Sequence, residues 1–75
     1  MKGKNNMSLQ CKNLPALEAF LEGKGAVSRP IDHGKQFSLP SGLLVNVFDK
    51  GTVTFQNHAD KSVEVSEIEK FINKL

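Results

Sequence analysis

Polar side chains alternate with apolar ones along the segment KQFSLPSGLLVNVFDKGTVTFQ, which spans residues 35–56. Three of the polar residues carry amides, which both donate and accept hydrogen bonds, and others on the same face carry a hydroxyl group or an aromatic ring. Such groups on one face of a sheet suit the recognition of nucleobases or of a nucleic-acid groove. Two lysines near the rim of this face could reach phosphates. The candidate ligand-binding residues are Gln36, Asn46, Phe48, Thr54 and Gln56, together with Lys35 and Lys50.

The same residue types also occur on strands that bind nothing. Thr and Gln are ordinary residues on the solvent face of a strand, and one Phe can cover its neighbours there. Two apolar residues on a polar face, Leu44 and Phe48, could equally contact a protein partner. The face alone therefore leaves three interpretations open: a solvated surface, a protein interface, and a nucleotide or nucleic-acid site.

Residues that would perform catalysis or bind a metal do not form a recognisable pattern. The two histidines, His33 and His58, fall in a predicted turn and a predicted loop. A metal site that added Cys11 or Asp60 would require distant segments to converge. The tripeptide GKG at residues 23–25 lacks the spacing of a phosphate-binding loop. We therefore predict no enzymatic activity, no catalytic residue, no metal and no cofactor.

Two turns divide residues 35–56 into three strands. Both LPSGL at residues 39–43 and FDKGT at residues 48–52 place a turn-forming residue ahead of a glycine that can adopt a positive φ. If each turn is a three-residue loop with a glycine bulge, the apolar pairs share one face, and a one-residue slip would mix the two faces. The pairs on that face are Leu39 with Leu43, Phe37 with Val45, Val45 with Phe55 and Val47 with Val53; on the other face Gln36 meets Asn46, Leu44 meets Gln56 and Phe48 meets Thr52.

Helices are predicted before and after the strands. Asn13 as the N-cap, Pro15 in the first turn and Gly23 as the stop indicate a helix over about residues 13–22. The capping box SEIE, with Ser66 as the cap, predicts a second helix from Glu67 to residue 75.

A further strand is predicted between the first helix and the three-strand segment, over residues 25–33. Because Pro30 has no N–H to donate, this strand should lie at an edge of the sheet. The register that we expect across the turn at residues 32–34 places Arg29 on the core side.

These elements predict an α+β fold in the order α-β-β-β-β-α. It is a two-layer sandwich, in which an antiparallel four-stranded meander carries both helices on one face. The other face is then open to solvent or to a partner. Residues 1–12 are expected to form a flexible basic tail and residues 13–75 a single α+β domain. The expected core contains Leu17, Phe20, Leu21, Phe37, Leu39, Val45, Val47, Val53, Phe55, Ile68, Phe71 and Ile72.

The composition constrains where the chain works more than what it binds. Its 75 residues and net charge of +2 indicate one small domain without the charge excess that predicts a polyanion partner. The single cysteine, Cys11, excludes an internal disulfide and fits a reducing compartment. No apolar run approaches the roughly 18 residues of a membrane span, and the N-terminus lacks the apolar region of a secretory signal. We therefore expect a cytoplasmic protein that does not bind membranes.

Residues 31–56 also form a longer motif, IDHGKQFSLPSGLLVNVFDKGTVTFQ. It resembles the N-terminal substrate-binding domain of ribonuclease HIII and the small domain beside TIR-like modules in predicted nucleotide-binding proteins, both of TATA-binding-protein-like fold. The family pattern often ends Gln-Gly-Lys, from which the QNH of residues 56–58 departs. The resemblance implies a curved sheet that binds nucleic acid or a nucleotide on its open face, usually beside a catalytic domain. Its least generic positions are Gly34, Gln36, Asn46, Phe48, Gly51 and Gln56.

The favoured function is a non-catalytic module that binds nucleic acid or a nucleotide through the open sheet face. The alternative is a protein–protein interaction module, such as a small phage or mobile-element protein that docks on a host factor, or a homodimer formed through the sheet. Salt separates the two, because binding through phosphates weakens steeply with salt whereas an apolar protein interface does not.

Overall fold

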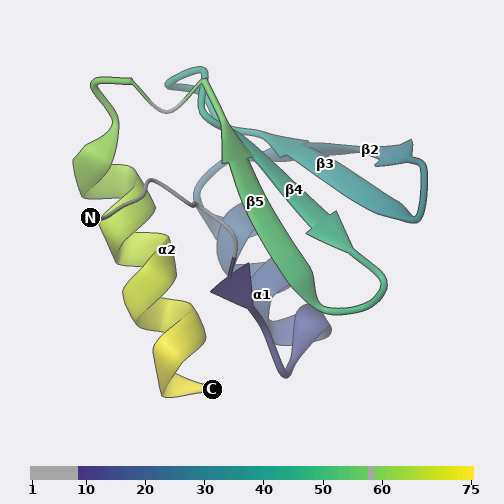
Figure 1. Cartoon of the computed structure of the whole chain (residues 1–75). Coiled ribbons are helices and arrows are strands. Elements are labelled where there is room, and N and C mark those ends of the chain that lie inside the picture. The colour runs from purple at the N-terminus through teal and green to yellow at the C-terminus, as the bar shows by residue number, and fades with distance from the viewer. Residues whose placement is uncertain (1–8, 58) are drawn as a thin grey trace, which may run out of the picture.

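The computed structural model describes residues 9–57 and 59–75, which form a small α+β domain with two helices and a five-stranded antiparallel sheet (Figure 1). The strand order is β1-β5-β4-β3-β2, so the strands after the first helix form a meander. The predicted α+β class is confirmed, but the sheet has one strand more than predicted. In chain order the elements are β1 (Leu9–Gln10), α1 (Leu14–Gly23), β2 (Val27–Ile31), β3 (Gly34–Ser38), β4 (Leu44–Phe48), β5 (Thr52–Gln56) and α2 (Ser62–Lys74).

The register of β3, β4 and β5 is the predicted one. Both turns that set it contain a glycine in the left-handed region, Gly42 with a φ of 101° and Gly51 with a φ of 98°. The N–H of Gly51 donates to the carbonyl of Phe48 at 2.8 Å, which closes the second turn. Turn chemistry and apolar alternation thus agree on one register. The paired residues include Phe37 with Val45, Gln36 with Asn46, Val45 with Phe55, Val47 with Val53 and Leu44 with Gln56.

The fifth strand, β1, lies where the sequence predicted a flexible tail. Leu9 and Gln10 pair with β5, and the N–H of Cys11 donates to the carbonyl of Gly51 at 2.7 Å. Cys11 itself is buried in the core, so the prediction of a tail is wrong for these residues. Two strand residues are too few to show a periodic pattern, and they are ordered by the otherwise unpaired backbone groups of β5. Residues 1–8 of the predicted tail lie outside the described residues.

The pairing of β2 differs from the prediction. Ile31 pairs with Gly34, which leaves a turn of two residues, and the second of these, His33, has a φ of 63°. In this register Arg29 pairs with Gln36, so its side chain lies on the polar side of the sheet and not on the core side. The length of the turn decides this outcome, because one residue more or less moves every side chain of the strand to the other face.

Two other local predictions hold. The N–H of Ala16 donates to Oδ1 of Asn13 at 3.2 Å, so Asn13 is the N-cap of α1, and Pro15 lies in the first turn. Pro30 lies in β2, at the edge of the sheet, where its missing N–H leaves the sheet interior intact.

The second helix, α2, begins at Ser62, more than a turn ahead of the predicted start. The predicted cap, Ser66, therefore lies inside the helix. The residue that extends the helix is Val65, which is 5% exposed and continues the apolar stripe of Ile68 and Ile72. Packing of this stripe stabilises the first turn although no side chain caps it.

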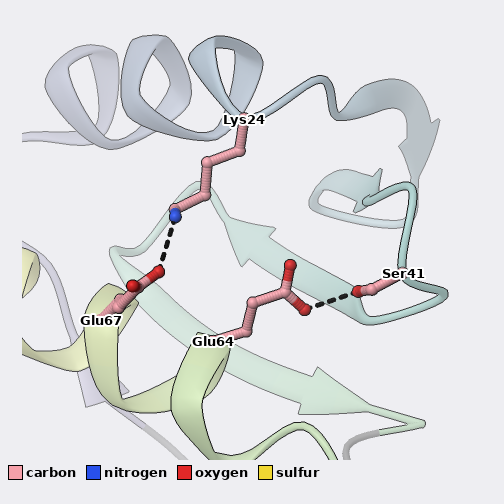
Figure 2. A network of polar contacts seen from close by, with 4 residues as sticks. All are labelled: Lys24, Ser41, Glu64 and Glu67. Carbon is pink, nitrogen blue, oxygen red and sulfur yellow. Dashed lines mark hydrogen bonds and ion pairs between the residues drawn. The ribbon is translucent and has the colours of Figure 1, made fainter.

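Two glutamates of α2 connect this helix to other parts of the fold (Figure 2). Glu67 accepts a hydrogen bond from Lys24, at the end of α1, with 2.7 Å between Nζ and Oε1. Glu64 accepts one from the hydroxyl of Ser41, in the turn between β3 and β4, at 2.5 Å. These exposed contacts tie α2 to α1 and to the strand turn outside the apolar core.

Buried residues of both helices and of the strands form one hydrophobic core. All but two of the predicted core residues are buried, and Cys11, Leu43 and Val65 join them. The two exceptions are Phe20 and Phe71, which are only partly buried. Their rings stack with centroids 4.1 Å apart, so they join α1 to α2 beside the core and not inside it.

Candidate functional site

The side of the sheet that carries Gln36 is called the polar face here. Alternation along each strand and the observed pairing place residues from all five strands on it. They are Gln10 of β1, Val27, Arg29 and Ile31 of β2, Gly34, Gln36 and Ser38 of β3, Leu44, Asn46 and Phe48 of β4, and Thr52, Thr54 and Gln56 of β5.

A chain of hydrogen bonds crosses the polar face over four adjacent strands. Nε of Arg29 donates to Oε1 of Gln36 at 3.1 Å, and Nε2 of Gln36 donates to Oδ1 of Asn46 at 2.9 Å. Nδ2 of Asn46 then donates to Oγ1 of Thr54 at 3.1 Å, and Nε2 of Gln36 also donates to Oε1 of Gln56 at 3.3 Å. The sequence predicted these amides side by side, and the structure places them so.

The predicted exposure of this group is wrong for its two central members. Gln36 is 7% exposed and Asn46 is 6% exposed. Gln36 uses both hydrogens of its amide nitrogen and its amide oxygen within the chain. Such buried amides are stable because they satisfy each other, and a ligand would have to break these bonds to use them. Gln36 therefore organises the face instead of reading a base.

One end of the polar face carries a hollow of about 250 Å³ lined by His33, Phe48, Lys50 and Thr52. Phe48 is half-buried at the end of β4. Its partner across the strand pair is Gly34, which has no side chain to cover the ring. We call this feature the Phe48 hollow; it combines an aromatic surface, a hydroxyl and a lysine.

The turn that carries Lys50 is held by the strand missed in the sequence. Nε2 of Gln10 donates to the carbonyl of Lys50 at 3.2 Å, and Oγ1 of Thr52 donates to Oε1 of Gln10 at 3.4 Å. Gln10 thus fixes the backbone on one side of the Phe48 hollow while the side chain of Lys50 remains exposed.

Lys35, the other predicted phosphate contact, does not lie on the polar face. Its Nζ donates to Oε1 of Glu18 in α1 at 3.3 Å, which places it on the side of the sheet that contacts this helix. Adjacent strand residues point to opposite faces, so Lys35 and Gln36 could not both have belonged to the site. Sequence reasoning missed Arg29 for the related reason that its face depended on the length of the turn at residues 32–33.

A second hollow, of about 320 Å³, lies between the helices and is lined by Phe20, Lys24, Glu67, Lys70, Phe71 and Lys74. Here the hydrogen bond from Lys24, and then its charge, hold the pKa of Glu67 below its usual range. The ion pair across this hollow uses Lys24 and Glu67 to join the two helices.

Two classes of feature are missing from the part of the chain that the structure describes. Its His, Cys, Asp and Glu residues form no group of three or more that could hold a metal ion; His58 lies outside the described residues. Neither described helix is long and apolar enough to cross a membrane.

No protein-family model, curated protein or solved structure matches this chain. Function is therefore inferred from the residues of the polar face and their geometry.

Proposed function

We propose that this chain is a non-catalytic binding module that binds a nucleotide or a strand of nucleic acid on the polar face of its sheet. The observation that carries this proposal is the Phe48 hollow, where a partly exposed aromatic ring lies beside Lys50 and Thr52. Bases of any sequence stack on aromatic rings, and a nearby lysine supplies the positive charge that a phosphate requires.

The proposal includes a two-layer arrangement, with both helices on one face of the sheet and the polar face open. It is supported by the single hydrophobic core, in which the buried residues of α1 and α2 join inward-facing residues of β3, β4 and β5. The proposed fold is TATA-binding-protein-like, on the motif resemblance of residues 31–56.

The charges on the polar face favour an anionic ligand. Its strand residues include Arg29 but no aspartate or glutamate, and Lys50 lies in the adjoining turn. The nearest carboxylates along the chain, Asp32 and Asp49, lie in the flanking turns. Positive charge beside an aromatic ring is the combination by which single-stranded nucleic acid is bound without sequence preference.

A chemical-shift titration tests the proposal. The probes are short single-stranded DNA, single-stranded RNA, an RNA–DNA hybrid duplex and mononucleotides. We expect saturable shifts at Phe48, Lys50 and Thr52 with at least one probe. In Lys50→Ala, the slope of log affinity against log salt should fall by about 0.7 for a single-stranded probe. The absence of shifts with every probe, or shifts confined to the helices, would contradict the proposal.

One observation favours a second candidate, a protein interface formed through the sheet. Val27 is 72% exposed and lies on the polar face of the edge strand β2. Exposed strand edges can pair with another chain, although Pro30 removes one donor from this edge. Sedimentation of the free protein separates the candidates, because a homodimer would depend on protein concentration and little on salt.

A further inference from the structure

We propose that Arg29 binds a phosphate of the ligand and that Gln36 positions it. We further infer that the ligand is a nucleic-acid strand that reaches from the Phe48 hollow to the edge strand β2. The inference rests on the proposed function and deepens it, because it chooses a strand over a mononucleotide and adds a residue that the sequence had placed in the core.

The first evidence is the way Arg29 is held. Its Nε donates to Oε1 of Gln36 at 3.1 Å, and within residues 9–57 and 59–75 its two terminal nitrogens make no hydrogen bond. Neither ion pair found among the described residues includes Arg29. The remaining pair of nitrogens is a planar fork that matches two oxygens of a phosphate.

The second evidence is that Gln36 can hold Arg29 in only one way. Its amide nitrogen donates to the amide oxygens of Asn46 and Gln56, at 2.9 and 3.3 Å, so its own oxygen is the group that faces Arg29. At 7% exposure this amide has little access to water as an alternative partner. The guanidinium is therefore oriented before a ligand arrives, which lowers the entropic cost of binding.

The third evidence is the spacing of the two anchors. Arg29 is aligned through Gln36 with Asn46, which lies two residues before Phe48 on a strand two positions away. From a strand spacing of about 4.8 Å and a rise of about 3.4 Å per residue, the Cα atoms of Arg29 and Phe48 are about 12 Å apart. The side chain of Arg29 extends toward Gln36 and shortens this gap. A mononucleotide offers one phosphate at one distance from its base, whereas an extended strand offers a phosphate on either side of a stacked base and further ones beyond.

The test measures binding of a short single-stranded oligothymidylate, thymidine monophosphate and inorganic phosphate to the full chain at several salt concentrations. The variants are Arg29→Gln and, as a matched control, Lys35→Gln. The control removes the same charge from the neighbouring strand but on the other face of the sheet. Melting curves establish that both variants are folded; Arg29 is exposed, so its replacement should leave the core intact.

We expect Arg29→Gln to weaken oligothymidylate binding about tenfold and to lower its salt slope by about 0.7, the value for one phosphate contact. Binding of thymidine monophosphate should change little, and Lys35→Gln should resemble the wild type. If Arg29→Gln weakens the binding of both ligands equally, the inference that the ligand is a strand is wrong, while the contact between Arg29 and a phosphate stands. If Arg29→Gln behaves like Lys35→Gln while Phe48→Ala still weakens binding, Arg29 has no role and the proposed function survives. If the wild type binds no probe, both proposals fail together.

The positioning role of Gln36 has its own readout. Gln36→Met keeps the net charge and most of the volume but removes the oxygen that holds Arg29. We expect weaker oligothymidylate binding, and no further loss when Gln36→Met is added to Arg29→Gln, because the two residues act as one unit. Independent, additive losses would show that Gln36 contributes through the fold and not through Arg29.

Discussion

Gln36 and Asn46 face each other across β3 and β4, and the amide nitrogen of Gln36 donates to the amide oxygen of Asn46 at 2.9 Å with both side chains more than nine-tenths buried. Amides at the centre of a sheet face would ordinarily be solvated and available to a ligand. Here these amides hydrogen-bond to each other. The groups that a ligand can contact therefore lie around them, at Arg29, Gln56 and Phe48.

This amide pair makes a prediction about stability. Asn46→Ala should lower the free energy of unfolding by about 1–3 kcal/mol, because it leaves a buried donor of Gln36 without its partner. The double variant Gln36→Met with Asn46→Leu should lie closer to the wild type, since it removes donor and acceptor together. Urea denaturation measures both, and a double variant that is less stable than Asn46→Ala would contradict this account.

The two glycine turns should differ in their tolerance of alanine. Gly42→Ala and Gly51→Ala should each destabilise the domain by about 1 kcal/mol or more, because both positions have a positive φ. Gly51→Ala should cost more, since a Cβ there would lie 2.8 Å from the carbonyl oxygen of Cys11, the residue that follows β1. At Gly42 the nearest atom, Nδ2 of Asn57, is 3.5 Å away. Thermal melts that rank the two variants in the opposite order would contradict the close approach of β1.

Phe55 carries the prediction about the core. Phe55→Ala should destabilise the domain by about 3–5 kcal/mol, a large part of the stability of a small protein, because the ring is buried in the hydrophobic core. Phe48→Ala is the matched control, since the same atoms are removed from a half-buried ring. Equal losses in denaturant titrations would mean that Phe48 belongs to the core and not to a site.

The ion pair between the helices makes stability depend on pH. The folded-state pKa of Glu67 is lowered by Lys24, so its contribution is complete above the unfolded-state pKa and is lost as pH falls through the folded-state value. The stability difference between the wild type and Glu67→Gln should therefore shrink as the pH falls from neutral through and below the ordinary glutamate range. Lys24→Met should remove most of that pH dependence, because only the weaker attraction of Lys70 then lowers the pKa of Glu67. A difference that stays constant into strong acid would show that the pair adds nothing.

Phe48 carries the prediction about binding. Phe48→Ala should weaken the binding of an oligonucleotide by about 1–3 kcal/mol, the value for one stacked base. The slope of log affinity against log salt should not change, because the ring supplies no charge. Leu44→Ala, on the same face but outside the Phe48 hollow, is the comparison. Weaker self-association in both variants, with little salt dependence and no effect on oligonucleotide binding, would favour the protein interface instead.

The sequence by itself determined the central part of the fold. The turns at Gly42 and Gly51, and the apolar alternation between them, agree on a single register, because a slip of one residue would turn Phe37 and Phe55 toward water. The same alternation placed Gln36, Asn46, Thr54 and Gln56 together on one face. Turn type and alternation depend on residues that are close together in the sequence, so both can be predicted from it.

Only the tertiary structure decided the rest, because the deciding contacts join residues far apart in the chain. β1 forms because it pairs with the otherwise free edge of β5, and a two-residue strand has no sequence pattern from which this pairing could be predicted. α2 begins before its predicted start because Val65 packs into a core that includes residues of the other elements. Arg29 lies on the polar face because a two-residue turn sets its register, and Gln36 and Asn46 find their hydrogen-bond partners on neighbouring strands. Burial and hydrogen-bond partners are properties of the assembled sheet, and single strands do not have them.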